Sequence, residues 1–327
     1  MHKSPRLVEW TPALVDGRPG FRLMIVLAAP GCAWYEASGG CTNCSFPQSM
    51  GTGQPVSADE FVDQLENAFD HIPTSTGSDA PIAVDLFVSG SFFNAEEVDV
   101  ESQRRMLMRT ARLPRIHRIL IETRPEYLSA DALNRALVAT GNVPLEIAIG
   151  LETASNEIRN KRIRKGFTWK QFEQSARLLA GTKAQLFVYV LVKPMNTSEA
   201  EALADAKDTA EKVFALAKEL NLPTRIGLEP CFVAPDTDLD KTFQAGKYRP
   251  PWLWTLLEVT RHVASLGPVH VGLSDENLQP AREAHNCDLC SGKVRAALAK
   301  FNLSQNPAAL DELDCACKAE WLKTIES

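Results

Sequence analysis

The sequence lacks any long apolar run. Among its 327 residues there is no stretch of about 18 or more consecutive apolar residues, which a membrane-spanning helix needs. The opening segment, MHKSPRLVEWTPALVDG, has no apolar core of the kind that a secretory signal peptide carries. We therefore expect a cytoplasmic protein that is not exported and has no membrane partner.

A surplus of basic residues is also missing. Lys and Arg number 35 against 41 Asp and Glu, so the formal net charge is −6, and aromatic residues make up only 7%. Any nucleic acid would have to bind through a local basic patch. Repeats, low-complexity tracts and long flexible linkers are absent too. At about 100 to 200 residues per domain, the length predicts two domains or one large α/β barrel with an appendage.

Cysteine, in contrast, is plentiful. In a reducing compartment a spaced set of cysteines indicates metal binding or catalysis rather than disulfides. Three lie near the N-terminus, one is isolated and four lie near the C-terminus: Cys32, Cys41, Cys44, Cys231, Cys287, Cys290, Cys315 and Cys317. This grouping predicts two separate metal centres.

Six apolar, β-branched runs recur along the chain. They lie at 22–28, 82–88, 118–123, 145–151, 186–192 and 225–229. Near-continuous apolar runs are typical of a parallel sheet that is buried on both faces. Between the runs, capping boxes at Ser57–Glu60 and Thr168–Gln171 predict helix starts. The βα alternation predicts either an open doubly wound sheet or a barrel.

Polar residues follow most of these runs. Any one of them is explained equally well as a turn residue, but five at corresponding places favour a barrel with a functional rim at the strands' carboxyl ends. The residues include Ser89, Gly90, Ser91, Arg124, Glu126, Glu152, Lys193 and Glu229. The pattern changes after residue 245, so we expect a core domain at 1–245 and an extension at 246–327.

The first cysteine group has the spacing CX8CX2C, formed by Cys32, Cys41 and Cys44. A structural zinc site uses four protein ligands, whereas a cluster that binds a further ligand keeps one position open. Three thiolates therefore suit a [4Fe-4S] cluster with one exposed iron. The alternatives are zinc completed by a distant histidine, or no metal.

Three cysteines in one loop after the first strand of a βα repeat resemble the radical S-adenosylmethionine (SAM) superfamily. The usual spacing there is CX3CX2C, so the first gap here is longer. The resemblance implies a partial (β/α)6 TIM-type barrel and a [4Fe-4S] cluster that cleaves SAM reductively, with a radical acting on substrate. It also implies an electron donor such as flavodoxin or ferredoxin.

The same resemblance assigns roles to individual residues. The glycine-rich segment at Ser89, Gly90 and Ser91 would meet the methionyl amino group of SAM. Glu152, Arg124 and Glu126 would contact SAM at other strand ends, although each is equally well explained as a member of a rim ion pair. Lys193 and Glu229 are weaker candidates for catalysis or substrate binding.

Longer phrases resemble a narrower family. GGCTNCSF, VSGSFFNAEEV, ETRPEYL, IAIGLETASNEIRNKRIRKGF, LVKP and YRPPWLW are together similar to the radical SAM enzymes of archaeosine biosynthesis, and more distantly to the Elongator catalytic subunit. This resemblance implies a lyase acting on transfer RNA (tRNA) that carries a lysine adduct on a 7-deazaguanine base. It also implies a partner transferase that supplies the adduct.

One segment offers the basic charge that tRNA requires. Residues 155–170 carry a net charge of +5. The candidate RNA contacts are Arg159, Lys161, Arg162, Arg164 and Lys165. A charge run is also common on an ordinary solvated face, so both interpretations stay open.

The second cysteine group reads CX2C and CXC, separated by 24 residues: Cys287, Cys290, Cys315 and Cys317. Two close pairs of thiolates favour tetrahedral zinc, and an auxiliary iron–sulfur cluster is the main rival. Residues 287–327 carry a net charge of −1, which favours a structural role over phosphate binding.

Two further functions stay open at this stage. The first is the same radical chemistry on a small molecule or peptide, with an auxiliary cluster. The second is a metal- or RNA-binding protein without catalysis, which predicts no SAM cleavage even after a cluster is reconstituted.

Overall fold

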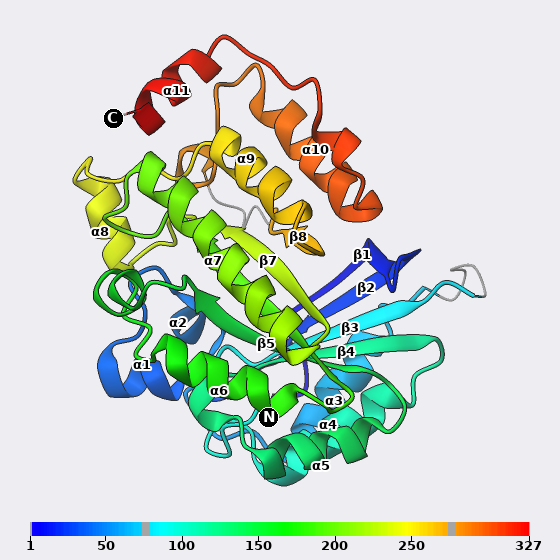
Figure 1. The fold of residues 1–327 in the computed structure, drawn as a ribbon. Helices are drawn as coiled ribbons and strands as arrows, with labels where there is room; N and C mark the ends of the chain where they lie inside the picture. The colour runs from blue at the N-terminus through cyan, green and yellow to red at the C-terminus, as the bar shows by residue number, and fades with distance from the viewer. Residues whose placement is uncertain (1, 74–78, 274–278, 327) are drawn as a thin grey trace.

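A partial barrel forms the centre of the molecule (Figure 1). The computed structural model describes residues 2–73, 79–273 and 279–326. Within these ranges eight strands form one sheet, in chain order from β1 to β8. β1 is antiparallel to β2, and every later neighbour is parallel. The strands are β1 (Leu7–Val15), β2 (Arg18–Val26), β3 (Ile82–Phe87), β4 (Ile116–Glu122), β5 (Leu145–Glu152), β6 (Ala184–Val192), β7 (Thr224–Pro230) and β8 (Val269–Val271).

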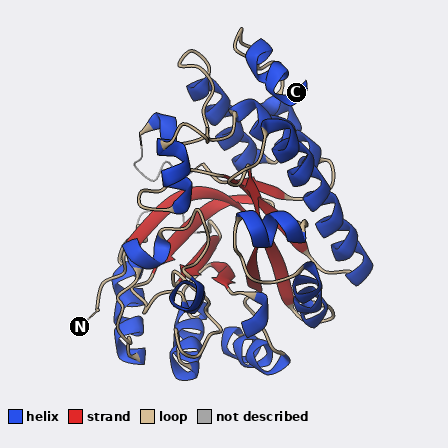
Figure 2. Ribbon diagram, turned by 90° about the vertical axis from the view of Figure 1, so that its left-hand side faces the viewer, coloured by secondary structure: helices blue, strands red, loops and turns tan. Residues whose placement is uncertain are grey.

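The predicted fold class is confirmed. β2 to β7 coincide with the six apolar runs, and they form the partial barrel that the sequence predicts. Figure 2 shows the curved strands with helices packed around their outer side. Because the order ends at β8 and no pairing joins β8 to β1 within the described ranges, the barrel stays open.

Helices follow the strands as the βα alternation requires. Both predicted capping boxes are present, at Ser57 and at Thr168. The helices are α1 (Ala33–Ser38), α2 (Phe46–Met50), α3 (Ala58–Phe69), α4 (Val100–Ala111), α5 (Ala130–Thr140), α6 (Trp169–Leu179), α7 (Glu199–Leu220), α8 (Asp238–Gln244), α9 (Leu253–Ala264), α10 (Ser291–Ser304) and α11 (Lys318–Glu326). Short turns complete the chain at η1 (Pro125–Tyr127), the π-helical η2 (Ile158–Arg162), η3 (Pro280–Arg282) and η4 (Pro307–Leu310).

The apolar core lies between the outer face of the sheet and these helices. Leu23 and Ile25 of β2 are fully buried in the same cluster as Phe61 and Leu65 of α3. Burying one such side chain contributes about 1.5–3 kcal/mol. The outward faces of the strands therefore hold the fold together and leave the inward faces for other chemistry.

β1 is an addition that the predicted strands did not include. It pairs with β2 through a tight turn at Asp16 and Gly17, whose φ angles are 50° and 73°. Trp10 stacks on Phe21 across the pair at 4.8 Å between ring centroids. Pro12 is tolerated because β1 is the edge strand, whose outer side needs no ladder bond.

The C-terminal segment packs on the open side of the barrel. β8 lies beyond residue 245 and pairs with β7. α10 contacts both β8 and β1, the two edges of the sheet (Figure 1). The segment after 245 thus supplies a strand and a helix that bridges the sheet edges, and the boundary near 245 stays a prediction.

Candidate active site

The first cysteine group lies just beyond the carboxyl end of β2. Cys32 precedes α1 as its N-cap residue, and Cys41 and Cys44 follow the same helix. All three are half-buried free thiols. Gly40 has a φ of 77°, and a Cβ there would lie 2.7 Å from the ring of Tyr35. The loop therefore needs glycine at this position to fold back and bring the later cysteines near the first.

The surroundings of these thiols fit a bound cluster and a polar ligand. Burial raises the pKa of Cys41, and it raises the pKa of Cys44 to about 12. A coordinated metal ion would replace those protons. Within the described residues, Asn43 Oδ1 and Ser89 Oγ are buried and have no hydrogen-bond partner. Asn43 lies between Cys41 and Cys44 in the chain, and Ser89 precedes Gly90, where a Cβ would lie 2.7 Å from the Gly31 carbonyl oxygen of the cysteine loop. Thiols together with free polar atoms fit the needs of a [4Fe-4S] cluster with SAM.

Glu97 joins the cysteine loop to the turn after β3. Its carboxylate accepts from the backbone N–H groups of Ala33 at 2.9 Å and Ser91 at 2.5 Å. It also accepts from the side-chain amide of Asn94 at 2.9 Å. Gly90 permits this approach, since a Cβ there would lie 1.9 Å from Glu97 Oε2. The predicted glycine-rich segment is thus held against the predicted cluster loop.

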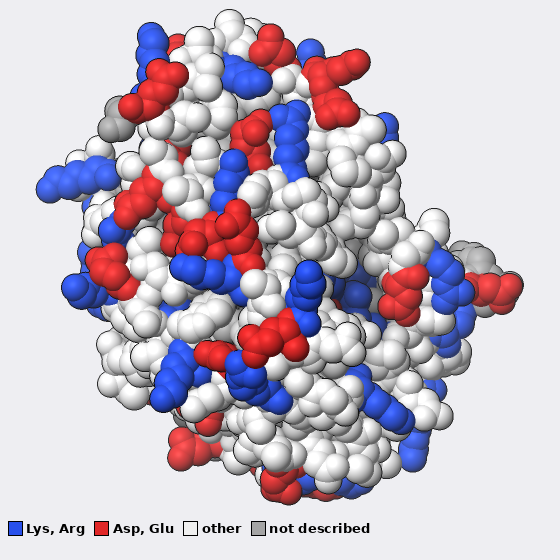
Figure 3. All heavy atoms as spheres, viewed as in Figure 1, with Lys and Arg blue, Asp and Glu red and all other residues white. Residues whose placement is uncertain are grey.

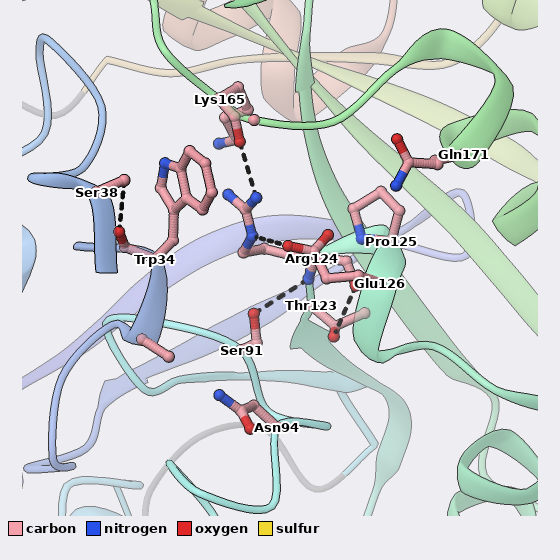
Figure 4. Close-up of polar contacts among 12 residues, drawn as sticks. Trp34, Ser38, Ser91, Asn94, Thr123, Arg124, Pro125, Glu126, Lys165 and Gln171 are labelled. Carbon is pink, nitrogen blue, oxygen red and sulfur yellow. Dashed lines mark hydrogen bonds and ion pairs between the residues drawn. The ribbon is translucent and has the colours of Figure 1, made fainter. Parts of the chain in front are cut away.

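Arg124 is already engaged in several contacts (Figure 4). Its side chain lies 2.5 Å from Glu126 Oε1 and donates to the carbonyl oxygen of Lys165 at 2.8 Å. Its backbone N–H donates to Ser91 Oγ at 3.2 Å. The guanidinium also lies over the ring of Trp34, 4.7 Å from its centroid. The structure therefore brings three of the predicted SAM residues together and adds Trp34 to them.

Glu152 pairs with Lys165, one of the residues that the sequence predicts as RNA contacts. Lys165 Nζ lies 2.6 Å from Glu152 Oε1, and both side chains are mostly buried. The charge of Lys165 also acts on Cys41. Burial lowers the pKa of Lys165, but attraction to Glu152 and to Cys41 and the hydrogen bond to Glu152 together outweigh burial and raise that pKa. This ammonium group therefore belongs to the mouth of the barrel, beside the cysteine loop, rather than to an outer surface.

Lys193 is held in a buried ion pair. Its Nζ lies 2.5 Å from Glu199 Oε2 at the start of α7. The hydroxyl of Tyr248 donates to the Lys193 carbonyl oxygen at 2.7 Å. Glu199 also accepts from the hydroxyl of Thr255 on α9. Through these contacts Lys193 joins β6, α7 and α9, and its role in catalysis or substrate binding stays a prediction.

The remaining rim candidate, Glu229, is the next-to-last residue of β7 and faces the residue that follows β8. A Cβ at Gly272 would lie 2.0 Å from Glu229 Oε2, so a larger residue there would displace the Glu229 carboxylate. The charge of Glu229 acts on Tyr189 of β6. Glu229 thus belongs to the polar interior of the barrel.

The basic segment at 155–170 is only partly available to a ligand. Arg159 is fully buried and donates to the carbonyl oxygens of Thr153 and Phe167, so it cannot touch RNA. Arg162 pairs with Glu157 and Glu201, and Arg164 pairs with Asp238. Lys161 is exposed. The π-helical turn η2 directs Arg159 inward, and no spacing rule in the sequence signals such a turn.

The second cysteine group forms a compact centre. Cys287 Sγ lies 3.7 Å from Cys290 Sγ and 3.5 Å from Cys315 Sγ, and Cys290 Sγ lies 3.5 Å from Cys317 Sγ. Among the described residues this is the group of side chains able to hold one metal ion, with all ligand atoms within 4.8 Å. The Trp254 indole N–H donates to Cys317 Sγ at 3.4 Å and connects the centre to α9.

Comparison with known proteins decides the family. No family model matches the chain. The archaeosine synthase subunit beta of Methanosarcina acetivorans is 33% identical over 320 residues, covering 97% of this chain and 89% of that protein. The chain belongs to the archaeosine synthase subunit beta family. A family member from Thermococcus kodakarensis is 29% identical over 321 residues, covering 96% and 94%. The predicted resemblance is thus confirmed.

A solved structure supports the fold of this archaeosine synthase subunit beta family member. Elp3 of Methanocaldococcus infernus, lacking its residues 1–46, superposes with a TM-score of 0.53 at 18% identity. The match covers 75% of this chain and 59% of the Elp3 chain, so it shows the fold alone. Across the described ranges we find no helix whose length and hydropathy suit a bilayer crossing.

Proposed function

We propose that this chain is the radical SAM subunit of a tRNA-modifying enzyme. The observation that carries the proposal is the set of three half-buried thiols just beyond the carboxyl end of β2, together with the unpartnered atoms of Asn43 and Ser89 in that loop and in the turn after β3. The named relatives support the tRNA context, because archaeosine synthase is the name that they bear.

Cys32, Cys41 and Cys44 would hold a [4Fe-4S] cluster, and the turn at Ser89–Ser91 would receive SAM. When bound, these cofactors supply the electron and the radical precursor for cleaving an unactivated bond. The chain's own residues position and shield them. Trp34 and Glu97 fix the cysteine loop, and Lys165 places a positive charge beside the thiolates.

The substrate that we propose is tRNA bearing a lysine adduct on a 7-deazaguanine base, with a lyase step that releases the formamidine of archaeosine. A subunit named beta implies a partner, and we assign to that partner the transferase that adds lysine. Lys161, together with the rim arginines Arg162 and Arg164, is the part of the basic segment that we propose for RNA contact. Flavodoxin or ferredoxin is the proposed electron donor.

For the second cysteine group we propose one zinc ion, held by the extension at 246–327. Ligands about 2.3 Å from a tetrahedral ion lie about 3.8 Å apart, and the Sγ distances of 3.5–3.7 Å are close to that spacing. The thiolates of a four-iron cluster lie farther apart, because each binds a different iron. The geometry therefore favours zinc over an auxiliary cluster.

The decisive experiment uses protein that is purified and reconstituted without oxygen. We expect about four irons and one zinc per chain, and 5′-deoxyadenosine after addition of dithionite and SAM. Cys41→Ser removes both iron and cleavage, whereas the matched change Cys231→Ser, at a buried cysteine outside both centres, removes neither. Full SAM cleavage by Cys41→Ser would refute the site, and about eight irons without zinc would refute the zinc assignment.

A further inference from the structure

The inside of the barrel carries charged residues where a TIM barrel is usually filled by branched apolar side chains. Arg225 of β7 donates two hydrogen bonds of 2.6 Å to Glu146 of β5, reaching across β6. Contacts of this kind identify the residues that face inward. They come from five strands and are Arg22, Asp85, Arg118, Glu146 and Arg225. We call this set the charged floor.

Such a floor contributes little to folding stability. Removing charged groups from water costs several kcal/mol per ion, which a buried pair recovers only with complete hydrogen bonding. Here that bonding is incomplete: within the described residues Asp85 Oδ1 is buried without a hydrogen-bond partner, and Arg118 Nε makes no hydrogen bond, although it lies 3.3 Å from Glu146 Oε2 in an ion pair. Asp85 Oδ1 therefore requires a donor, and Arg118 Nε can still donate to a closer acceptor. Buried charges with incomplete bonding of both kinds point to a ligand that carries both kinds of group.

A second polar layer lies above the floor. The hydroxyl of Tyr189 hydrogen-bonds to Glu122, and burial raises the pKa of Glu122 to about 7. Asp85 and Glu229 add negative charge near Tyr189. Burial lowers the pKa of His270 to about 3, so this ring adds no positive charge. The upper layer is therefore suited to a cation, which would relieve the accumulated negative charge.

The two layers connect to the proposed active site. The charges of Lys165 and Glu152, beside the cysteine loop, act on Glu122. Glu122, Tyr189 and Arg225 each keep partial solvent exposure although they face inward. Charged and polar side chains therefore continue from the cysteine loop into the barrel. Figure 3 shows a hollow to the right of centre in which Lys or Arg atoms are visible, and it lies toward the β1–β2 turn, at the opposite end of the strands from α1 and α2.

We infer that this interior binds the α-amino acid end of the substrate, with Asp85 and Glu122 receiving the ammonium group and Arg118 and Arg22 receiving the carboxylate. The identity of that end rests on the proposed function, in which a lysine adduct extends from the tRNA base. The base would stay near the rim, and the reacting carbon of the adduct would lie between the base and the bound amino acid end.

Three matched ligands test the inference by calorimetry on the anaerobic, reconstituted protein. Nε-acetyl-L-lysine keeps both groups, N-acetylcadaverine lacks the carboxylate, and 6-acetamidohexanoate lacks the ammonium. We expect the first to bind at least about tenfold more tightly than the others, which corresponds to about 1.4 kcal/mol. Glu122→Gln and Arg118→Gln each weaken it about tenfold or more, whereas the exposed control Glu66→Gln on α3 does not.

The inference is overturned by equal binding of the three ligands or by no binding at about 10 mM. It is also overturned if Glu122→Gln and Arg118→Gln both leave the affinity for Nε-acetyl-L-lysine unchanged. Thermal unfolding checks each variant, and Tyr189→Phe, which removes only a hydroxyl, replaces any that fails to fold. SAM cleavage is measured on the same samples. If the protein cleaves SAM but binds the three ligands equally, the proposed function stands and the assignment of the barrel interior falls. If it prefers Nε-acetyl-L-lysine but does not cleave SAM, the assignment of the barrel interior stands and the proposed function falls.

Discussion

The indole ring of Trp34 lies against the guanidinium of Arg124, with 4.7 Å between Arg124 Cζ and the ring centroid. Its N–H donates to the carbonyl oxygen of Arg164 at 2.9 Å. The ring also packs on Gly166, where a Cβ would lie 2.2 Å from it. A single side chain of the cysteine loop thus joins the end of β4 to the segment after β5.

Trp34→Ala should loosen the cysteine loop without removing any thiol. The cation–π contact contributes about 0.5–2 kcal/mol and the hydrogen bond about 1 kcal/mol. We expect iron to be lost several times faster to a chelator, measured by the decay of cluster absorbance. Trp34→Phe keeps an aromatic face and loses only the hydrogen bond, so its rate should lie between those of Trp34→Ala and the unmodified protein. Equal rates for all three proteins would contradict this role.

The charge of Glu122 should make folding depend on pH. Its pKa of about 7 in the folded protein exceeds the ordinary value of 4.5. The folded state therefore binds the proton more tightly, and this stabilisation is complete below about pH 4 and lost as the pH rises through 7. Glu122→Gln removes the dependence. We expect the free energy of unfolding of Glu122→Gln to equal that of the unmodified protein near pH 4 and to exceed it at pH 8. Urea unfolding of the ligand-free proteins measures both values. A constant difference across that range would contradict the assignment.

The parallel strands were predictable because each is a near-continuous apolar run, and burial on both faces leaves few other uses for such a run. β1 was not predictable, since its exposed alternate residues and Pro12 interrupt the run of apolar residues that marks the other strands. The dipeptide Asp16-Gly17 was the available signal, because both residues tolerate the positive φ of a tight hairpin turn.

Cysteine spacing predicted both candidate metal centres, since ligands of one centre often lie close together in the chain. The roles of charged residues were harder to predict. Lys165 and Glu152 are 13 residues apart and meet only because of how the intervening chain folds. Arg159 is buried by a π-helical turn. Glu122 lay within a predicted apolar strand, and only the curvature of the sheet turns it toward a polar interior.

Lys193→Met should reduce stability and leave the cluster in place. The change leaves Glu199 buried without its partner cation, a loss of about 3–5 kcal/mol in comparable pairs. Denaturant unfolding should show that loss, while iron content stays as in the unmodified protein. A stability loss below about 1 kcal/mol combined with loss of SAM cleavage would instead support the predicted catalytic role.

Removal of the metal ion that we propose at the C-terminal cysteines should open the side of the barrel that α10 covers. Cys290 precedes α10 directly, and this helix contacts both β1 and β8. Cys315→Ser or a zinc chelator should increase hydrogen exchange in α10 and in β1, and lower the melting temperature. Exchange in α3, on the other side of the barrel, serves as the internal control. Unchanged exchange in α10 after zinc loss would contradict a structural role.

Exposed lysines of the basic segment should contribute to tRNA binding through phosphate contact. Lys161 and Lys170 are exposed, and the double variant Lys161→Ala, Lys170→Ala should weaken binding at low salt. Each lost phosphate contact reduces the slope of log affinity against log salt by roughly 0.7 to 0.9, so the loss of two contacts should reduce the slope by about 1.4 to 1.8. The control Lys212→Ala, Lys218→Ala removes two equally charged, exposed residues from α7 and should leave the slope unchanged. An equal fall for both pairs would show a diffuse electrostatic effect, and no change for either would assign tRNA binding to the partner subunit.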